Sequence, residues 1–370
     1  MLKASLSSSS SVAVAAEASR SKALLLTNLA LNIIRGGSET ARNWPSKNST
    51  AALCEIRERA KKADFILEVR DARIPVSSTN EVLRELGTST NHFIVLNKMD
   101  LANPSMTWKA YYQLHEQWHV FVNTHNKDSV KDMLKEMKVP LDEMLKQEKP
   151  LLGLVVGVPN IGKSALINSL QLTVGNSQPA KERAKKAEVG PLPGITKKIS
   201  SYQIDYFPKM YLLDTPGVLP PEICDAERTL KLAITGVLDD AYIDEEQLAR
   251  YVLALLSVNH SSLHAKWLAE AELKGLLNAS GDNLKAKKRR QDPDSKFEVR
   301  GIIASTRMNF GGDLANEDEI NSLIDTQIRE LRRTFLIPDG AGDWKKAAKK
   351  ILNLYRTGKL GSYTWDNVPV

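Results

Sequence analysis

The sequence predicts an α/β protein in which a doubly wound, mainly parallel six-stranded sheet is followed by an all-helical C-terminal domain. Two observations support this fold class. Up to residue 220, short apolar runs alternate with helical patterns, as expected of strands that are covered on both faces. Beyond residue 220, apolar residues recur at the helical spacings of three and four, for example at Ile320, Leu323, Ile324, Ile328 and Leu331.

The predicted strands all lie before the proposed domain boundary. They are residues 64–70, 92–97, 118–123, 151–157, 199–206 and 210–214. The first four runs are nearly continuous in apolar residues, which is typical of a parallel sheet with helices on both faces. The predicted domains are therefore an α/β domain over residues 43–220 and a helical domain over residues 221–370.

The composition is that of a globular protein with room for two or three domains. The 370 residues are 42% hydrophobic and 26% charged, which excludes collagen, coiled-coil fibres and wholesale disorder. Two cysteines, Cys54 and Cys224, cannot form a disulfide framework, and no Cys/His cluster has the spacing of a zinc site. The net charge of +7 is a mild basic bias that would suit a polyanionic partner.

The first 38 residues have the composition of a targeting segment. They are rich in serine, and a single acid, Glu17, stands against Lys3, Arg20, Lys22 and Arg35. This pattern is typical of an organellar transit peptide. We expect residues 1–38 to be a disordered transit peptide; an ordinary disordered tail is the alternative. No run of about 18 apolar residues occurs in the chain, so no transmembrane span is predicted.

The octapeptide GVPNIGKS, which ends at Ser164, predicts a loop that binds nucleotide phosphates. It fits the pattern GxxxxGK[ST] and lies between an apolar strand and a helical run, which is the context that this motif needs. Backbone N–H groups of Asn160, Ile161 and Gly162 would surround a phosphate at the start of the helix. Lys163 would neutralise the β- and γ-phosphates, and the hydroxyl of Ser164 would bind Mg²⁺.

Two later loops are predicted to complete this phosphate site. In the sequence DTPG, the carboxylate of Asp214 would hold Mg²⁺ through water, and the N–H of Gly217 would meet the γ-phosphate. A simple Pro-Gly turn is the alternative interpretation of DTPG. Thr196 lies between the two motifs along the chain, and we expect its hydroxyl to complete the Mg²⁺ shell. The predicted catalytic residues are Lys163, Thr196 and Gly217.

The sequence NKMD, which ends at Asp100, predicts recognition of guanine. A carboxylate at Asp100 can accept hydrogen bonds from guanine N1–H and the 2-amino group, a pair of donors that adenine lacks. Asn97 and Lys98 are expected to contact the nucleotide from the same loop. Asn123 and Thr124 form the predicted second base-binding loop, with the Thr124 amide facing guanine O6. An ATP-using P-loop kinase or ATPase is the alternative that Asp100 disfavours.

The order of these motifs along the chain is unusual. The base motif and the second base loop precede the phosphate loop, Thr196 and DTPG, whereas ordinary small GTPases have the phosphate loop first. The same sheet is retained if the original termini are joined and the chain is opened after DTPG, because domain termini usually lie close together. The sequence therefore predicts a circularly permuted P-loop GTPase domain. DTPG then leads directly into the helical domain, so loss of the γ-phosphate is expected to move that domain.

Four segments resemble the YlqF/YawG family of circularly permuted GTPases, especially its mitochondrial ribosome-associated GTPases and plant DAR GTPases. They are VRDARIPVSS with Asp71-Ala72-Arg73, GVPNIGKS, DTPGVLPP and the closing segment YRTGKLGSYTWD. The resemblance covers about residues 43–370. It implies a GTPase with GTP and Mg²⁺ as cofactors and a low intrinsic rate. One departure is that the family's Asn-Trp-Phe-Pro-Gly-His-Met is replaced here by Asn-Trp-Pro-Ser from Asn43, without Gly-His-Met.

The same resemblance implies a partner and a compartment. The expected function is assembly or quality control of the organellar large ribosomal subunit through contact with its rRNA, by a monomer that binds no DNA. The mitochondrial matrix is the expected location, with the chloroplast as the alternative and peripheral association with the inner membrane left open. Basic clusters suited to RNA, each with solvated surface as the alternative, are residues 181–186, residues 285–290, and Lys345, Lys346, Lys349 and Lys350.

Two residues bear on how fast GTP would be hydrolysed. Val218 follows DTPG at the position where many GTPases have a glutamine, and an aliphatic side chain cannot orient water. A nucleotide-gated module that binds ribosome or rRNA with little or no hydrolysis is therefore the alternative function. Asn160 resembles the asparagine with which related GTPases coordinate an activating K⁺. We hypothesise a K⁺ near the phosphates in place of an arginine finger.

Overall fold

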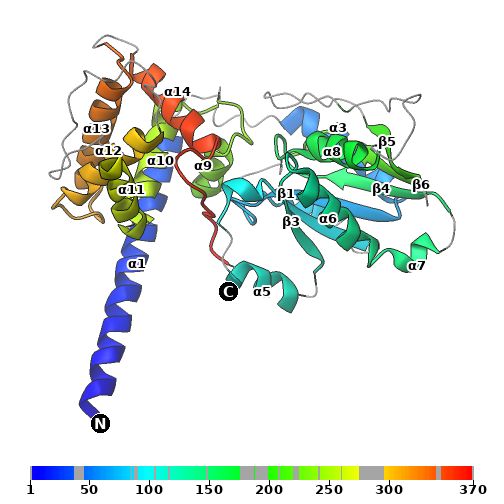
Figure 1. The fold of residues 1–370 in the computed structure, drawn as a ribbon, viewed down its shortest axis with the longest axis horizontal. Coiled ribbons are helices and arrows are strands. Elements are labelled where there is room, and N and C mark those ends of the chain that lie inside the picture. The colour runs from blue at the N-terminus through cyan, green and yellow to red at the C-terminus, as the bar shows by residue number, and fades with distance from the viewer. Residues whose placement is uncertain are drawn as a thin grey trace. The chain divides into compact units, whose positions relative to one another are not determined.

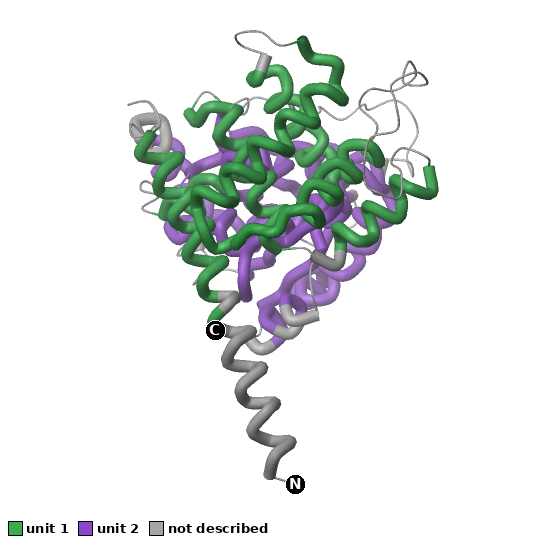
Figure 2. Tube along the Cα trace, turned by 90° about the vertical axis from the view of Figure 1, so that its left-hand side faces the viewer, with its two compact units in different colours: residues 1–42, 225–230, 240–360 green, residues 43–224, 231–239, 361–370 purple. Residues whose placement is uncertain are grey.

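The computed structural model describes the chain as two compact units. The described residues are 2–36, 46–84, 86, 91–103, 106–115, 117–146, 149–175, 187, 199–206, 209–219, 225–240, 242–259, 261–274, 296–338 and 343–368. The sheet unit comprises residues 43–224, 231–239 and 361–370, and the helical unit comprises residues 1–42, 225–230 and 240–360 (Figure 2). The chain therefore returns to the sheet unit twice after residue 224.

The sheet unit contains a six-stranded sheet in the order β3-β2-β1-β4-β6-β5 (Figure 1). The strands are β1 (Phe65–Asp71), β2 (Asn91–Asn97), β3 (His119–Val122), β4 (Leu151–Val156), β5 (Ser200–Tyr206) and β6 (Lys209–Asp214). Neighbouring strands are parallel except β5 and β6, which form an antiparallel pair. The predicted fold class and the six predicted strands are confirmed, and no strand end differs from its prediction by more than one residue.

The strand register brings the carboxyl ends of the parallel strands to one edge of the sheet. Asp71 at the end of β1 is paired with Asn97 of β2, and Asn97 is paired with Val122 of β3. On the other side of β1, Val155 of β4 is paired with Asp214 of β6. The strand order reverses between β1 and β4, and open α/β sheets bind ligands at the carboxyl end of such a switch point.

Helices cover the sheet through apolar clusters. Ile56 of α3 packs with Ile66 and Leu154, and Trp108 of α5 packs with Ile94. Every residue of β1 is buried, so the opposite face of the sheet is covered as well. Helix α6 packs on β3, α8 packs on β5, and the two helices pack against each other. The helices of this unit are α3 (Ser46–Ala60), α4 (Glu81–Arg84), the 3₁₀ helix η2 (Met99–Leu101), α5 (Met106–Leu114), α6 (Lys127–Lys138), α7 (Asp142–Leu145) and α8 (Lys163–Gly175).

The helical unit is organised around α10 (Glu245–Asn259), in which almost every residue from 248 to 258 is buried. This helix packs against α1 (Leu2–Gly36), α12 (Lys296–Met308), α13 (Glu317–Thr334) and α14 (Asp343–Arg356), and α11 (Ser261–Leu273) packs on α12. The apolar residues predicted to form one face of a helix are all buried in α13. Asn316 caps that helix by accepting hydrogen bonds from the N–H groups of Asp318 and Glu319.

The structure differs from the predicted N-terminal segment. Residues 2–36 form helix α1 in the structure, whereas we expected a disordered segment over residues 1–38. Leu25, Leu26, Leu29 and Ala30 recur at a helical spacing and are buried, and α1 packs on α10. Within the described residues, no helix combines the length and the apolar character needed to cross a bilayer.

The structure also divides the C-terminal half differently from the prediction. The predicted helical domain runs without interruption over residues 221–370, whereas residues 231–239 and 361–370 belong to the sheet unit. Helix α9 (Ala226–Ile234) thus begins in the helical unit and ends in the sheet unit. The two returning segments are joined by an ion pair of 3.2 Å between Lys231 Nζ and Asp366 Oδ1, a tertiary contact that local sequence patterns do not encode.

Gly153→Ala should destabilise the sheet unit, because Phe65 is the cross-strand partner of Gly153 and its buried ring occupies the place of an added Cβ. Overpacking of this kind costs about 1–3 kcal/mol. Urea unfolding followed by circular dichroism measures the loss. Gly311→Ala is the matched control, since an added Cβ there meets nothing within 4 Å. Equal midpoints for the two variants would contradict this packing.

Candidate nucleotide-binding site

The phosphate loop, residues 157–164, connects β4 to α8 at the switch point of the sheet. Gly157 and Gly162 have φ angles of 144° and 96°, which side chains rarely adopt. A Cβ on Gly157 would overlap the carbonyl oxygen of Val69 in β1, and a Cβ on Gly162 would overlap the side-chain amide of Asn97. Only glycine at these two positions lets the loop lie directly on β1 and on the base motif.

Lys163 points back into the phosphate loop. Its Nζ donates hydrogen bonds to the carbonyl oxygens of Gly157 at 3.2 Å and Val158 at 2.9 Å, and its side chain is buried. Burial lowers the pKa of Lys163 to about 8, although the nearby Asp214 carboxylate opposes this shift. A cation whose hydrogen bonds go to neutral carbonyls can exchange them for phosphate oxygens.

Ser164 and Asp214 present oxygen atoms side by side. The Ser164 hydroxyl donates to Asp214 Oδ2 at 2.6 Å, and Asp214 Oδ1 is buried with no hydrogen-bond partner among the described residues. Burial raises the pKa of Asp214, against the lowering effects of Ser164 and Lys163. A hydroxyl beside a carboxylate with a spare buried oxygen is the donor chemistry that Mg²⁺ prefers, so these residues fit the ion.

The DTPG loop lies against the phosphate loop. A Cβ on Gly217 would come within 2.5 Å of Pro159 Cα and 3.0 Å of Lys163 Nζ, and Val218 N–H donates to Gly157 O at 3.3 Å. The Val218 side chain is only 1% exposed and belongs to the apolar cluster that contains Ile56 of α3. Val218 is therefore part of the core.

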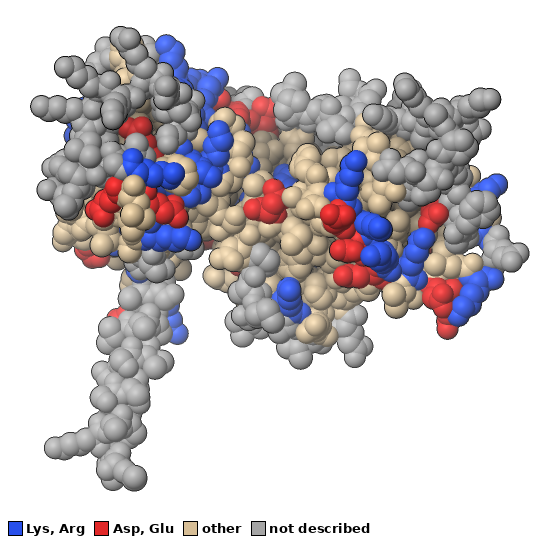
Figure 3. All heavy atoms as spheres, in the orientation of Figure 1, with Lys and Arg blue, Asp and Glu red and all other residues tan. Residues whose placement is uncertain are grey.

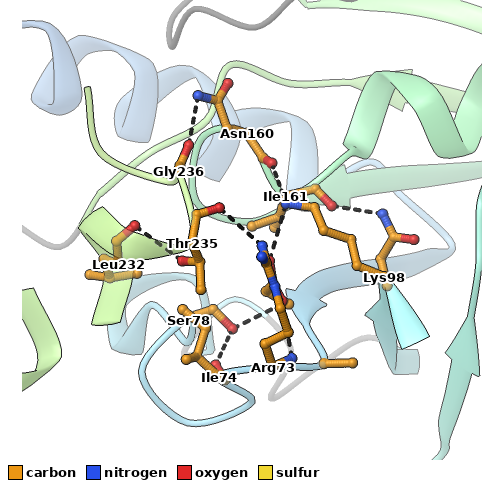
Figure 4. Close-up of polar contacts among 12 residues, drawn as sticks. Arg73, Ile74, Ser78, Lys98, Asn160, Ile161, Leu232, Thr235 and Gly236 are labelled. Carbon is orange, nitrogen blue, oxygen red and sulfur yellow. Dashed lines mark hydrogen bonds and ion pairs between the residues drawn. The ribbon is translucent and has the colours of Figure 1, made fainter. Parts of the chain in front are cut away.

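The base motif is hydrogen-bonded to the phosphate loop. Asn97 Nδ2 donates a hydrogen bond to Ile161 O at 2.7 Å. Lys98 Nζ donates a hydrogen bond to Asn160 O at 3.0 Å (Figure 4). Asp100 lies in η2 and is exposed, so its carboxylate is accessible to a base. The structure thus joins two motifs that are about 60 residues apart in the chain and belong to different strands.

The predicted second base loop is hydrogen-bonded to the base motif and within its own turn. Thr124 N–H, which we expected to face guanine O6, lies 3.4 Å from Asn97 Oδ1 and donates to it. Asn123 stabilises its own turn, because its Oδ1 accepts a hydrogen bond from His125 N–H at 2.9 Å. Thr196 lies outside the described residues, as do the basic clusters at residues 181–186 and 285–290.

Asp71 and Arg73 support the site, whereas from the sequence they are identified only as part of a segment that resembles the family. The buried Asp71 carboxylate accepts two hydrogen bonds from the Arg73 guanidinium, at 2.9 and 2.7 Å, and lies 3.1 Å from Lys98 Nζ. Burial raises the pKa of Asp71, but the charges of Arg73 and Lys98 outweigh it and hold this pKa well below its usual range. A carboxylate and an arginine two residues apart at the end of a buried strand are the sequence pattern from which this ion pair could have been predicted.

A turn at the end of α9 is the second feature that the sequence did not predict. Arg73 Nη2 donates to Thr235 O at 3.0 Å, and Asn160 Nδ2 donates to Gly236 O at 3.0 Å (Figure 4). Asn160 itself has a φ of 55°, in the left-handed region. The turn at Thr235 and Gly236 therefore contacts the phosphate loop through Asn160. It also contacts Arg73, which shares the Asp71 carboxylate with Lys98.

Comparisons with known proteins find a matching family and several similar proteins. A family described as 50S ribosome-binding GTPase matches residues 153–279, from β4 onward. The chain is 39% identical to Short integuments 2, mitochondrial, of Arabidopsis thaliana, over 88% of this chain and 89% of that protein. It is 37% identical to DAR GTPase 2, mitochondrial, of the same plant, over 91% and 93%. It is 36% identical to mitochondrial ribosome-associated GTPase 1 of Mus musculus, over 60% and 68%.

The fold and the site define a P-loop GTPase whose base motif precedes its phosphate loop in the chain. The chain belongs to the family of circularly permuted GTPases that includes the DAR GTPases and the mitochondrial ribosome-associated GTPases. The resemblance predicted from the sequence motifs is confirmed.

The affinity for GDP should fall as the pH rises above 8. The protonated form of Lys163 binds phosphate, and its pKa of about 8 without nucleotide means that the proton must be regained on binding at higher pH. We expect a constant Kd between pH 7 and pH 7.5, and a rise approaching tenfold per pH unit above pH 8. Fluorescent GDP titrations to pH 9 measure this. Lys163→Met should bind weakly at every pH; a flat wild-type profile would refute the assignment.

Proposed function

We propose that this protein binds and hydrolyses GTP in assembly or quality control of the large subunit of the mitochondrial ribosome. One observation carries the nucleotide part of the proposal: Asn97 and Lys98 of the base motif donate hydrogen bonds to the phosphate loop. A single ligand with a guanine at one end and phosphates at the other spans these two motifs. The names of the family and of the relatives support the ribosomal and mitochondrial parts.

In this proposal each residue has a defined task. Asp100 accepts hydrogen bonds from guanine, and Lys163 holds the β- and γ-phosphates. Ser164, Asp214 and Thr196 hold Mg²⁺, which when bound neutralises charge on the phosphates. The N–H of Gly217 contacts the γ-phosphate from DTPG.

The slow step of the proposed reaction is the activation of water. The Val218 side chain is buried in the core, so the group that orients water or stabilises charge comes from outside this loop. We propose that K⁺ beside Asn160 supplies part of that charge and that the ribosomal subunit stimulates turnover. Nucleotide-dependent binding without hydrolysis remains the second candidate, and the burial of Val218 is the observation that favours it.

The proposed rRNA contact lies in the helical unit, and its basic residues are partly engaged. Lys349 Nζ lies 3.5 Å from Glu245 Oε1, and Lys350 Nζ lies 5.1 Å from the ring centre of Phe335. On the face drawn in Figure 3, basic and acidic side chains are interspersed. Lys345, Lys346 and Lys349 are exposed, and together with Lys350 they are the residues of α14 that we propose for RNA contact. The basic, serine-rich start of the chain is the proposed mitochondrial targeting segment.

Asp100→Asn should change the base preference from guanine to xanthine. The variant loses the carboxylate that accepts two hydrogen bonds from guanine, and we expect at least about a 100-fold loss of GTP affinity with a gain for xanthosine triphosphate. Competition binding with the two nucleotides measures this change. Asp132→Asn, an exposed aspartate of α6, is the matched control. Undiminished GTP binding by Asp100→Asn would overturn the base-motif assignment.

GTP turnover should rise when purified mitochondrial large subunits are added in K⁺ buffer, and should fall when Na⁺ replaces K⁺. The reason is that the chain offers Asn160 for a cation but has an aliphatic residue after DTPG. Released phosphate measures the rate in each of the three conditions. Intact GTP binding with no turnover in any of them would favour the binding module, and equal rates in K⁺ and Na⁺ would exclude the K⁺ role.

A further inference from the structure

The last described part of the chain runs along the base motif. Residues 240–360 belong to the helical unit, whereas residues 361–370 belong to the sheet unit. The change of unit begins at Gly361, whose φ is 115° and where a Cβ would lie 2.6 Å from the Tyr363 hydroxyl. In Figure 1 this segment leads to the C-terminal end of the described chain beside α5. We call residues 361–366 the strap.

Three consecutive residues of the strap bind the segment that carries Asp100. The Ser362 hydroxyl donates to Asp100 O at 3.0 Å, and Tyr363 N–H donates to Leu101 O at 3.1 Å. The Thr364 hydroxyl accepts a hydrogen bond from Asn103 N–H at 3.3 Å. The backbone that follows the Asp100 side chain, from Asp100 O to Asn103 N–H, is thus held from outside.

The same strap also binds the loop that follows β1. The Thr364 hydroxyl donates to Ala72 O at 3.3 Å, and Trp365 N–H donates to Arg73 O at 2.8 Å. Because Arg73 binds Asp71, and Asp71 binds Lys98, this contact fixes the second support of the base motif.

Asp366 anchors the end of the strap. Its carboxylate accepts hydrogen bonds from the N–H groups of Val76 and Ser77, each at 2.8 Å, and from the Ser77 hydroxyl at 2.7 Å. Lys231 Nζ completes the set at 3.2 Å. The two aromatic side chains of the strap are buried, whereas Ser362 is exposed. The rings of Tyr363 and Trp365 stack with their centres 4.9 Å apart, and both residues are less than 10% exposed.

We propose that the strap is a positioning element for guanine recognition, which sets the affinity and the lifetime of the bound nucleotide. Asp100 lies in a single turn of 3₁₀ helix, a short element with poor hydrogen-bond geometry. A recognition group on such an element needs support from its surroundings to stay in a productive position. The strap provides that support before the nucleotide arrives. The inference rests on the proposed binding of guanine nucleotides.

The test removes two strap hydroxyls without touching the nucleotide residues. The double variant Ser362→Ala/Thr364→Val should release fluorescent GDP about tenfold faster, because it loses the hydrogen bonds that hold Asp100 O and Asn103 N–H. It should also lose part of its preference for GDP over IDP, which lacks the 2-amino group that Asp100 recognises. Stopped-flow dissociation and competition binding measure the two effects.

Two further variants separate positioning from general destabilisation. Ser362→Ala/Thr364→Ser keeps the Thr364 hydroxyl and should recover part of the lost GDP preference. Thr326→Val removes an exposed hydroxyl of α13 that bonds only within its helix at 3.0 Å, and should change neither readout. Folding of all variants is checked by circular dichroism, and Asp366→Asn replaces the double variant if that one does not fold.

The outcomes are distinguishable. Unchanged GDP release overturns the proposal, and so does faster release with an unchanged ratio of GDP to IDP affinity, because that result indicates only a loosened fold. If the wild-type protein binds no guanine nucleotide, the proposed function fails first.

Discussion

The buried carboxylate of Asp71 is the charge on which the nucleotide site depends. It lies in a fully buried position and has two cationic neighbours, Arg73 and Lys98. Breaking a buried ion pair by removing one partner typically costs about 3–5 kcal/mol, because the remaining charge is left without compensation. The same two cations also bind other loops, since Lys98 donates a hydrogen bond to the phosphate loop and Arg73 donates one to Thr235 O. One side chain therefore fixes the relative positions of three loops.

The permuted chain order is compatible with this site because the site depends on the edge of a sheet. Asp71 and Asn97 are neighbours in the register of β1 and β2, and Val155 and Asp214 are neighbours in that of β4 and β6. Parallel strands deliver their carboxyl ends to the same edge whatever their order in the chain. The connection between α6 and β4, which includes α7, closes the chain where the unpermuted order would have its termini.

Sequence patterns predict the parts of this structure that are local. The strands follow from apolar runs, and the phosphate loop follows from glycines between a strand and a helix, so both agree with the structure. The turn at Gly236 and the contacts of Asp366 depend on partners more than 60 residues away, and the role of Asp71 depends on Lys98, which follows the next strand of the chain. Helix α1 does not follow from the sequence, because its polar, serine-rich start obscures the short apolar stripe that packs on α10.

The two segments that return to the sheet unit give the permutation a structural consequence. Residues 231–239 end at the phosphate side of the site, where Gly236 O binds Asn160. The strap lies at the base side, where the Ser362 hydroxyl binds the backbone of Asp100. Both segments are continuous in the chain with the helical unit, and Lys231 binds Asp366 directly. The phosphate side and the base side of the site are therefore each continuous in the chain with the helical unit.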